Sequence, residues 1–296
     1  MIEQPEENKI MAQLDPKTIG AHIRTRRQQL TPLELKVIDQ ILAKPDFSES
    51  TPLKEIAEEN HVSEAMIVKI AKKLEFSGFR ELRSGLAYYR QLDVASLHSE
   101  ISEQDDSAQI IKKVFETSIQ ALEETLAILD IEAFERSVEI LCNAKSIDLF
   151  GIGGSAQIAK DMAHKFLRIG IKATVYDDSH MMLMASAVCN DASAVITVSH
   201  SGTTIDVIEP LQLARRNGAK TIAITNYATS PITQYADVVL NSTSQGSLLL
   251  GENAAARIAQ LNILDALYVA VAKRNLSRAE ANLRKTRAAV ESKRIK

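Results

Sequence analysis

Apolar residues recur at helical spacing in the first third of the chain, where short helices follow one another. One of them begins with Thr31, Pro32 and Glu34, a capping box that has proline in the first helical position. We expect this helix to stop before Pro45, because proline cannot continue it. Its inward stripe is expected to be Leu35, Ile38, Ile41 and Leu42.

The next two predicted helices are joined by a tight turn. One starts near Thr51, and the other is capped by Ser63 and spans Glu64 to Leu74. The small Ala57 lets the two helices approach closely, and Val62 plugs the turn between them. The inward positions of the last helix are Ile67, Ile70, Ala71 and Leu74. This arrangement predicts a helix-turn-helix whose last helix enters the major groove of DNA.

A helix-turn-helix presents its last helix to base edges and its flanking cations to phosphates. Residues 61–90 hold six basic and three acidic side chains, a local excess that suits a polyanion. The base-facing group is predicted to be Ser63, Glu64, Ala65, Met66 and Lys69. The phosphate contacts are predicted to be Lys72, Lys73, Arg80 and Arg83. The alternative is a small helical bundle with a solvated lysine face.

After about residue 145 the pattern changes, and apolar runs alternate with helical stretches. These runs fall at residues 146–150, 173–176 and 194–198. Such alternation is typical of a doubly wound parallel sheet covered by helices. We therefore expect a helix-turn-helix domain at 17–93, an acidic and polar linker at 94–110, an α/β domain at 111–276 and a C-terminal helix or tail at 277–296.

Two of the apolar runs lead directly into loops that suit a phosphate. Residues 199–204 read Ser-His-Ser-Gly-Thr-Thr, and a helical stretch follows at once. The loop around Gly151 and Ser155 also lies between a predicted strand and a predicted helix. Such loops bring together backbone N–H groups, hydroxyls and the positive end of a helix dipole. Two of them at the carboxyl ends of parallel strands fit one small phosphorylated ligand held across a crevice.

The glycine loop also permits a second interpretation, in which the chain senses NAD(H). Gly151, Gly153 and Ala156 match the dinucleotide-binding fingerprint, and the acidic pair Asp177 and Asp178 follows the next apolar run. The loop at 199–204 favours the phosphorylated ligand, because a simple dinucleotide fold does not need it.

Composition narrows the class of protein. The 296 residues are 45% hydrophobic, enough for a core in each of about two domains, and the formal net charge of −3 gives nucleic acid no global attraction. Any DNA binding must therefore come from a local patch. The chain has no apolar run of about 18 residues and no secretory leader, so we expect a cytoplasmic protein without a membrane span. Cys142 and Cys189 lack disulfide or metal-ligand spacing and are expected to be buried reduced thiols, with no metal and no cofactor.

Motifs in both halves carry a family resemblance. Residues 62–83 read Val-Ser-Glu-Ala-Met-Ile-Val-Lys-Ile-Ala-Lys-Lys-Leu-Glu-Phe-Ser-Gly-Phe-Arg-Glu-Leu-Arg and resemble the helix-turn-helix of RpiR-type bacterial transcriptional regulators. The loops at 153–156 and 199–204, with residues 164–170, resemble the sugar isomerase (SIS) domain of that family. The resemblance covers about residues 20–275 and keeps the family's domain order. It implies an N-terminal helical DNA-binding bundle and a C-terminal α/β SIS domain.

The resemblance implies a repressor of sugar-metabolism genes whose SIS domain binds a phosphorylated sugar and thereby alters operator affinity. His164 and Lys165 are placed near the sugar, with a helix-face pair at a dimer contact as the alternative. Reading two half-sites requires a homodimer or homotetramer on palindromic double-stranded DNA. The ligand-binding residues carried over are Gly154, Ser155, Ser199, His200, Ser201, Gly202 and Thr204.

A sugar-phosphate isomerase is a third interpretation, because SIS domains also occur in such enzymes. Isomerisation needs a base, and Glu252 stands in the loop before a helix starting at Ala254, where those enzymes place a glutamate. In a chain with an attached helix-turn-helix, we expect Glu252 to bind a sugar hydroxyl and we predict no catalytic residue.

Overall fold

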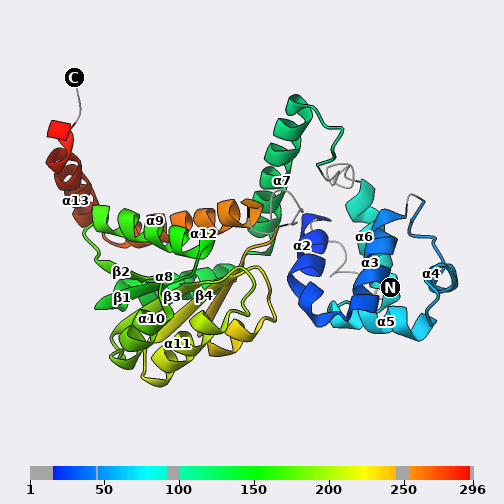
Figure 1. Ribbon diagram of the computed structural model, residues 1–296, viewed down its shortest axis with the longest axis horizontal. Coiled ribbons are helices and arrows are strands. Elements are labelled where there is room, and N and C mark those ends of the chain that lie inside the picture. The colour runs from blue at the N-terminus through cyan, green and yellow to red at the C-terminus, as the bar shows by residue number, and fades with distance from the viewer. Residues whose placement is uncertain (1–15, 45, 92–100, 245–253, 294–296) are drawn as a thin grey trace, which may run out of the picture.

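The computed structural model describes residues 16–44, 46–91, 101–244 and 254–293. A helical N-terminal unit and an α/β unit lie side by side along the longest axis of the molecule (Figure 1). Helix α7 stands between them, and α13 lies at the end of the molecule far from the N-terminal unit (Figure 1).

The N-terminal unit is helical throughout its described residues, as the periodicity predicted. Thr31 forms the predicted capping box of α3, and the Ser63 side chain accepts a hydrogen bond from the Met66 N–H at the start of α5. Val62 packs against the core of this unit, where Ala57 is buried. Its helices are α2 (Pro16–Arg26), the 3-10 turn η1 (Arg27–Gln29), α3 (Pro32–Ala43), α4 (Leu53–Glu59), α5 (Glu64–Lys73) and α6 (Phe79–Gln91).

The α/β unit contains a five-stranded parallel sheet in the order β2-β1-β3-β4-β5. Its strands are β1 (Ser146–Phe150), β2 (Ala173–Tyr176), β3 (Ser193–Val198), β4 (Lys220–Thr225) and β5 (Val238–Asn241). All six residues of β3 are buried, which is typical of a central strand covered on both faces. The doubly wound sheet predicted from the alternating pattern is confirmed.

Helices cover both faces of this sheet. Side chains from α8, α9 and α12 share one core with the sheet, and those of α10 and α11 share another (Figure 1). The helices of this unit are α7 (Ser107–Ile128), α8 (Ile131–Asn143), α9 (Gly154–Arg168), α10 (Ser179–Ala187), α11 (Ile205–Arg216), α12 (Ala254–Arg274) and α13 (Leu276–Ala289), with the 3-10 turns η3 (Pro231–Tyr235) and η4 (Glu291–Lys293).

The structure differs from the sequence expectations at three places. Helix α7 starts at Ser107, inside the residues assigned to the linker, because Asp106 and Gln109 form a capping box. Cys142 is exposed on α8, whereas Cys189 is buried, and both are free thiols. Helix α12 is long and apolar enough to cross a membrane, but much of its apolar surface is buried in the core of the sheet unit.

A buried polar cluster joins the two units. Arg24 of α2 forms an ion pair with Glu124 of α7, and their side chains are only 12% and 3% exposed. Tyr89 of α6 donates a hydrogen bond to the same carboxylate, and so does Gln120 of α7, at 3.4 and 2.7 Å. A buried charge is tolerated only when it is paired, so this cluster fixes α2 against α7.

Candidate functional site

The two predicted loops meet at the carboxyl ends of β1 and β3. These strands are adjacent in the sheet. From β1 the chain continues to β2 on one side of the pair, and from β3 it continues to β4 on the other side. Such a topological switch point is the usual ligand crevice of an open α/β sheet. Helix α9 begins at Gly154 after the first loop, and α11 begins after the second, with Thr204 as its N-cap.

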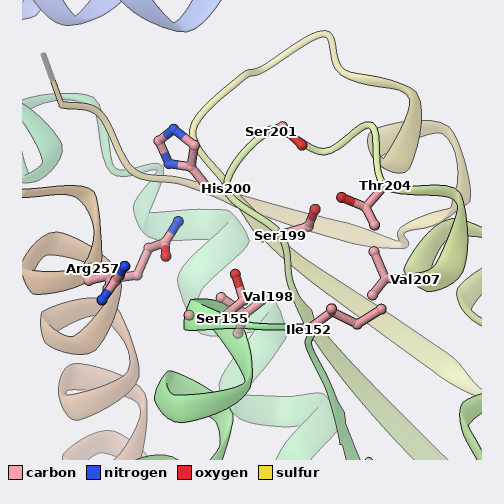
Figure 2. Close-up of a pocket in the computed structure, with 11 residues that line it drawn as sticks. Ile152, Ser155, Val198, Ser199, His200, Ser201, Thr204, Val207 and Arg257 are labelled. Atoms are coloured by element: carbon pink, nitrogen blue, oxygen red, sulfur yellow. The ribbon is translucent and has the colours of Figure 1, made fainter. Parts of the chain in front are cut away.

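Hydroxyl groups from both loops surround one space. Figure 2 shows the oxygens of Ser155, Ser199 and Thr204 around it, with Ser201 at its rim and Arg257 on the side opposite Thr204. The N-cap residues of α9 and α11 form no side-chain hydrogen bond to the first turn of their helices. The backbone N–H groups at both helix ends are therefore presented to this space as donors. This is the environment in which phosphate groups bind.

The second loop keeps its shape through contacts of its own. The Ser199 side chain accepts a hydrogen bond from the Gly202 N–H at 3.2 Å, and Ser201 accepts one from the Thr203 hydroxyl at 2.9 Å. Gly202 has a φ of 62°, and a Cβ there would lie 2.1 Å from the Ser230 Oγ. Only glycine fits this backbone position, so Gly202 shapes the loop and is absent from the cavity lining.

The cavity between the loops has a volume of about 200 Å³. Two residues that sequence reasoning missed, Arg257 and Gln260 of α12, also line it. Gln260 is buried and donates to the Ser242 hydroxyl at 3.3 Å. The full lining is Ile152, Gly154, Ser155, Val198, Ser199, His200, Ser201, Thr204, Val207, Arg257 and Gln260.

Arg257 is a cation placed beside the positive end of a helix. Its guanidinium lies over Gly154, the first residue of α9, where an added Cβ would be 3.0 Å from the Arg257 Nε. Gly154 therefore makes room for the guanidinium. No acidic residue in the described part of the chain forms an ion pair with Arg257. An anion bound in the cavity would relieve this concentration of positive charge.

Several predicted ligand residues lie elsewhere. Lys165 forms ion pairs with Asp161 at 2.6 Å and with Asp265 of α12, more than two turns along α9 from the cavity. His164 is exposed beside it, and neither side chain lines the cavity, which corrects their placement near the sugar. Glu252 lies outside the described residues.

The carboxylates of the dinucleotide interpretation are occupied. Asp177 forms an ion pair with Lys160 at 2.7 Å, and this hydrogen bond lowers the pKa of the Asp177 carboxyl. Asp178 is the N-cap of α10 and accepts from the Met181 N–H at 3.0 Å. Each carboxylate therefore already has a partner on one of its two oxygens.

The predicted DNA-facing residues divide into two groups. Ser63, Glu64, Ala65, Lys69, Lys72 and Arg80 are exposed, while Met66 is half-buried against the helical core. Lys73 donates to the buried Glu34 carboxylate at 2.6 Å. Arg83 donates to the Thr51 carbonyl at 3.0 Å and stacks over Phe79. These last two cations hold the fold together, which leaves Lys72 and Arg80 of the predicted phosphate contacts.

The chain matches two known domain families, the helix-turn-helix domain of the rpiR family over residues 17–92 and the SIS domain over residues 140–270. The HTH-type transcriptional regulator RpiR of Escherichia coli K12 is 38% identical over 278 residues, which cover 93% of this chain and 94% of that protein.

Solved structures show the same architecture. The sugar isomerase domain of an RpiR transcription factor from Sphaerobacter thermophilus is 28% identical, with a TM-score of 0.56 over 60% of this chain and 98% of that one. The Vibrio vulnificus NanR protein complexed with ManNAc-6P has a TM-score of 0.60 over 93% of this chain and 100% of that one. At 21% identity, the second likeness is one of fold.

Proposed function

Because the chain belongs to the RpiR family of helix-turn-helix transcriptional regulators, we propose that its SIS domain binds a phosphorylated sugar and thereby changes operator affinity. The observation that supports this most is the cluster of hydroxyls from Ser155, Ser199, Ser201 and Thr204 at the N-termini of α9 and α11. A phosphate there accepts from hydroxyls and backbone N–H groups and faces two helix dipoles. The related NanR fold was solved with the phosphosugar ManNAc-6P.

Arg257 completes this proposed effector site. It supplies a full positive charge opposite the Thr204 end of the cavity, and we assign it to the bound phosphosugar (Figure 2). A guanidinium offers a planar fork of donors to phosphate or sugar oxygens. None of the described lining residues carries a carboxylate.

The dinucleotide alternative is weakened by the same geometry. Asp177 is paired with Lys160, and Asp178 caps α10, so both carboxylates already have a structural role without a ribose. The hydroxyl loop at 199–204 gains a direct role only from a phosphorylated ligand. Stabilisation by NAD(H) with no response to sugar phosphates would restore the dinucleotide interpretation.

We propose that the SIS domain acts as a sensor and has no isomerase activity. This is supported by the relatives, because the chain matches a helix-turn-helix family and is 38% identical over most of its length to a transcriptional regulator. Isomerisation would require a base beside the two reacting carbons. The test incubates the protein with ribose 5-phosphate and follows the aldose and ketose signals by NMR. Turnover above the buffer control would show isomerase activity and contradict this proposal.

The proposed assembly is a homodimer or homotetramer that represses by binding a palindromic operator in the cytoplasm. Helix α7 carries an exposed apolar stripe at spacings of four residues, since Ile111, Phe115 and Ile119 are 60%, 66% and 52% exposed. Such a stripe is suited to a helix of a second copy. Light scattering of Phe115→Glu against the unaltered protein tests this surface, and an unchanged mass would contradict its role in assembly.

The effector proposal is tested by thermal-shift measurements against a panel of sugar phosphates, with NAD(H) and the unphosphorylated sugars as controls. Stabilisation that grows with the concentration of one sugar phosphate supports the proposal and identifies its effector, because only binding to the folded state produces it. Ser155→Ala and Thr204→Ala should lose the response to that compound. A panel without any response from the unaltered protein would contradict the proposal.

A further inference from the structure

Positive charge is concentrated in the last part of the chain. Residues 273–296 contain nine basic and two acidic residues, whereas residues 101–272 contain twelve basic and twenty acidic ones. The helical unit at 16–91, which includes the helix-turn-helix, has thirteen basic and ten acidic residues. The C-terminal segment is therefore more basic than the unit that reads DNA, although it is attached to an acidic domain.

Helix α13 carries four of these nine cations on a fixed surface. One side is anchored on the α/β unit, since Ala279 is buried in the core and the Asn282 side chain donates to the Ile169 carbonyl at 2.9 Å. Thr286 also donates to the Arg168 carbonyl, at 3.3 Å. The helix is thus held in place at the end of α9, and its other side faces solvent.

The exposed side is basic and largely unpaired. Arg278, Arg284, Lys285 and Arg287 are all exposed, as is the neighbouring Arg168 of α9. Within the described residues, Lys285 and Arg287 have no ion pair, and Arg284 has only a solvent-exposed one with Glu280 at 3.7 Å. Pairs of that kind contribute little to stability, so packing does not account for these cations.

We infer that α13 is a second DNA-binding surface, which contacts the phosphodiester backbone outside the base pairs read by α5. The inference goes beyond the proposed effector function and does not depend on it. A row of arginine and lysine side chains on a docked helix suits phosphate contacts, which add affinity without sequence preference. The chain already has a helix-turn-helix domain for DNA, so the polyanion that binds α13 can be the same DNA.

The position of α13 determines which DNA it contacts. It lies at the opposite end of the long axis from the helix-turn-helix (Figure 1). A short duplex bound at α5 of the same chain therefore does not reach it, whereas flanking DNA or the DNA bound by a neighbouring subunit does. The contribution of α13 should be largest when the duplex extends well beyond the sequence that the helix-turn-helix occupies.

The experiment measures affinity for random-sequence duplexes of 20 and 60 base pairs at several salt concentrations. The variant Arg284→Gln/Lys285→Gln/Arg287→Gln should bind the long duplex with a salt dependence lower by about 2.7 in log–log slope, if each cation neutralises one phosphate. The loss of slope should be smaller on the short duplex, because a duplex of that length occupies α5 or α13 but does not span both. The matched control removes three exposed cations elsewhere, as Lys112→Gln/Arg216→Gln/Lys220→Gln, and should retain the full slope.

Three outcomes would overturn the inference. The first is an unchanged slope for the α13 variant on the long duplex, and the second is an equal loss in the control variant. The third is binding of phosphatidylserine vesicles that the α13 variant loses while its DNA binding is intact, which would assign the helix to a membrane surface. Circular dichroism of each variant confirms that the exposed substitutions leave the fold intact.

Discussion

The Nε2 of Gln28 donates a hydrogen bond to the carbonyl oxygen of Ser201 at 3.1 Å. Gln28 lies in η1, directly after α2 of the helical unit, and Ser201 lies in the loop that forms the proposed effector site. A second contact runs beside it, because the Ala228 N–H donates to the Thr25 carbonyl at 3.1 Å. The proposed effector loop therefore touches the DNA-binding unit directly.

Gln28→Ala should weaken the effect of the sugar phosphate on operator affinity. The substitution removes the hydrogen bond between Gln28 and the Ser201 carbonyl. The factor by which the effector changes operator affinity should therefore fall by about twofold to tenfold, the equivalent of one hydrogen bond. The affinity for the sugar phosphate itself should change little. Operator titrations with and without effector measure the coupling. Gln40→Ala, exposed on α3, is the control, and equal coupling in all three proteins would contradict a role for this contact.

Arg257→Gln should reduce the affinity for the phosphorylated effector by roughly tenfold to a hundredfold, the usual contribution of a hydrogen bond to a charged group. The cause is the loss of the only lysine or arginine side chain among the described cavity residues. Calorimetry with the compound found in the thermal-shift panel measures the change. DNA binding without effector should be unaffected.

Arg257→Lys separates charge from geometry at this position. A lysine keeps the positive charge but not the planar fork, so its affinity should lie between those of the unaltered protein and the glutamine variant. If both variants bind as tightly as the unaltered protein, Arg257 is not part of the effector site.

Lys72→Gln/Arg80→Gln should weaken DNA binding without loss of stability. Both side chains are exposed and have no ion pair among the described residues, so the double variant should lower the salt slope by about 1.8. Lys73→Gln should behave differently, because it leaves the buried Glu34 carboxylate without its cation and should destabilise the fold by about 1–3 kcal/mol. Thermal unfolding and DNA titration of the same samples separate the two effects. Identical unfolding of Lys73→Gln and the unaltered protein would show that this ion pair is dispensable.

Acid should destabilise the helical unit through His22. Burial lowers the pKa of His22, and the charge of Arg26 lowers it further, against opposing contributions from the Leu74 carbonyl, Glu75 and Glu81. The unfolded chain therefore takes up the proton first as the pH falls below about 6.5. Stability contributed by neutral His22 is complete above that pH and is lost as the pH falls toward its folded pKa.

The measurement is the unfolding temperature between pH 7.5 and 5. His22→Gln should show a smaller decrease over this range than the unaltered protein, because the titrating group is gone. The exposed His180→Gln should keep the full decrease. Parallel curves for the unaltered protein and His22→Gln would exclude His22 as the group responsible.

Local signals in the sequence predicted the elements that are determined locally. The caps formed by Thr31 and Ser63 placed the starts of α3 and α5, because a cap is decided within one helical turn. Helix α2 was not predicted. Its position depends on Arg24, which meets its partner Glu124 from a hundred residues away in the sequence, and no local pattern reveals such a contact.

The candidate site was predicted to a similar extent. Its loops follow β1 and β3, so topology alone brings Ser155 and Ser199 together. Arg257 was missed because it belongs to α12, and which side of that helix faces the crevice depends on packing against the sheet. Lys165 was predicted to lie near the sugar, but its ammonium group instead forms an ion pair with Asp265 on the neighbouring helix α12.

The ion pair between Arg24 and Glu124 also limits how this architecture can be rearranged. The boundary between the two halves lies between α6 and α7 in the sequence, but the charge of α7 is balanced by a residue of the other half. A SIS domain expressed without α2 would keep its whole sheet, but Glu124 would lose both its cation and part of the protein that covers its carboxylate. Chimeras that exchange DNA-binding halves between relatives should fold well only when both members of this pair are inherited together.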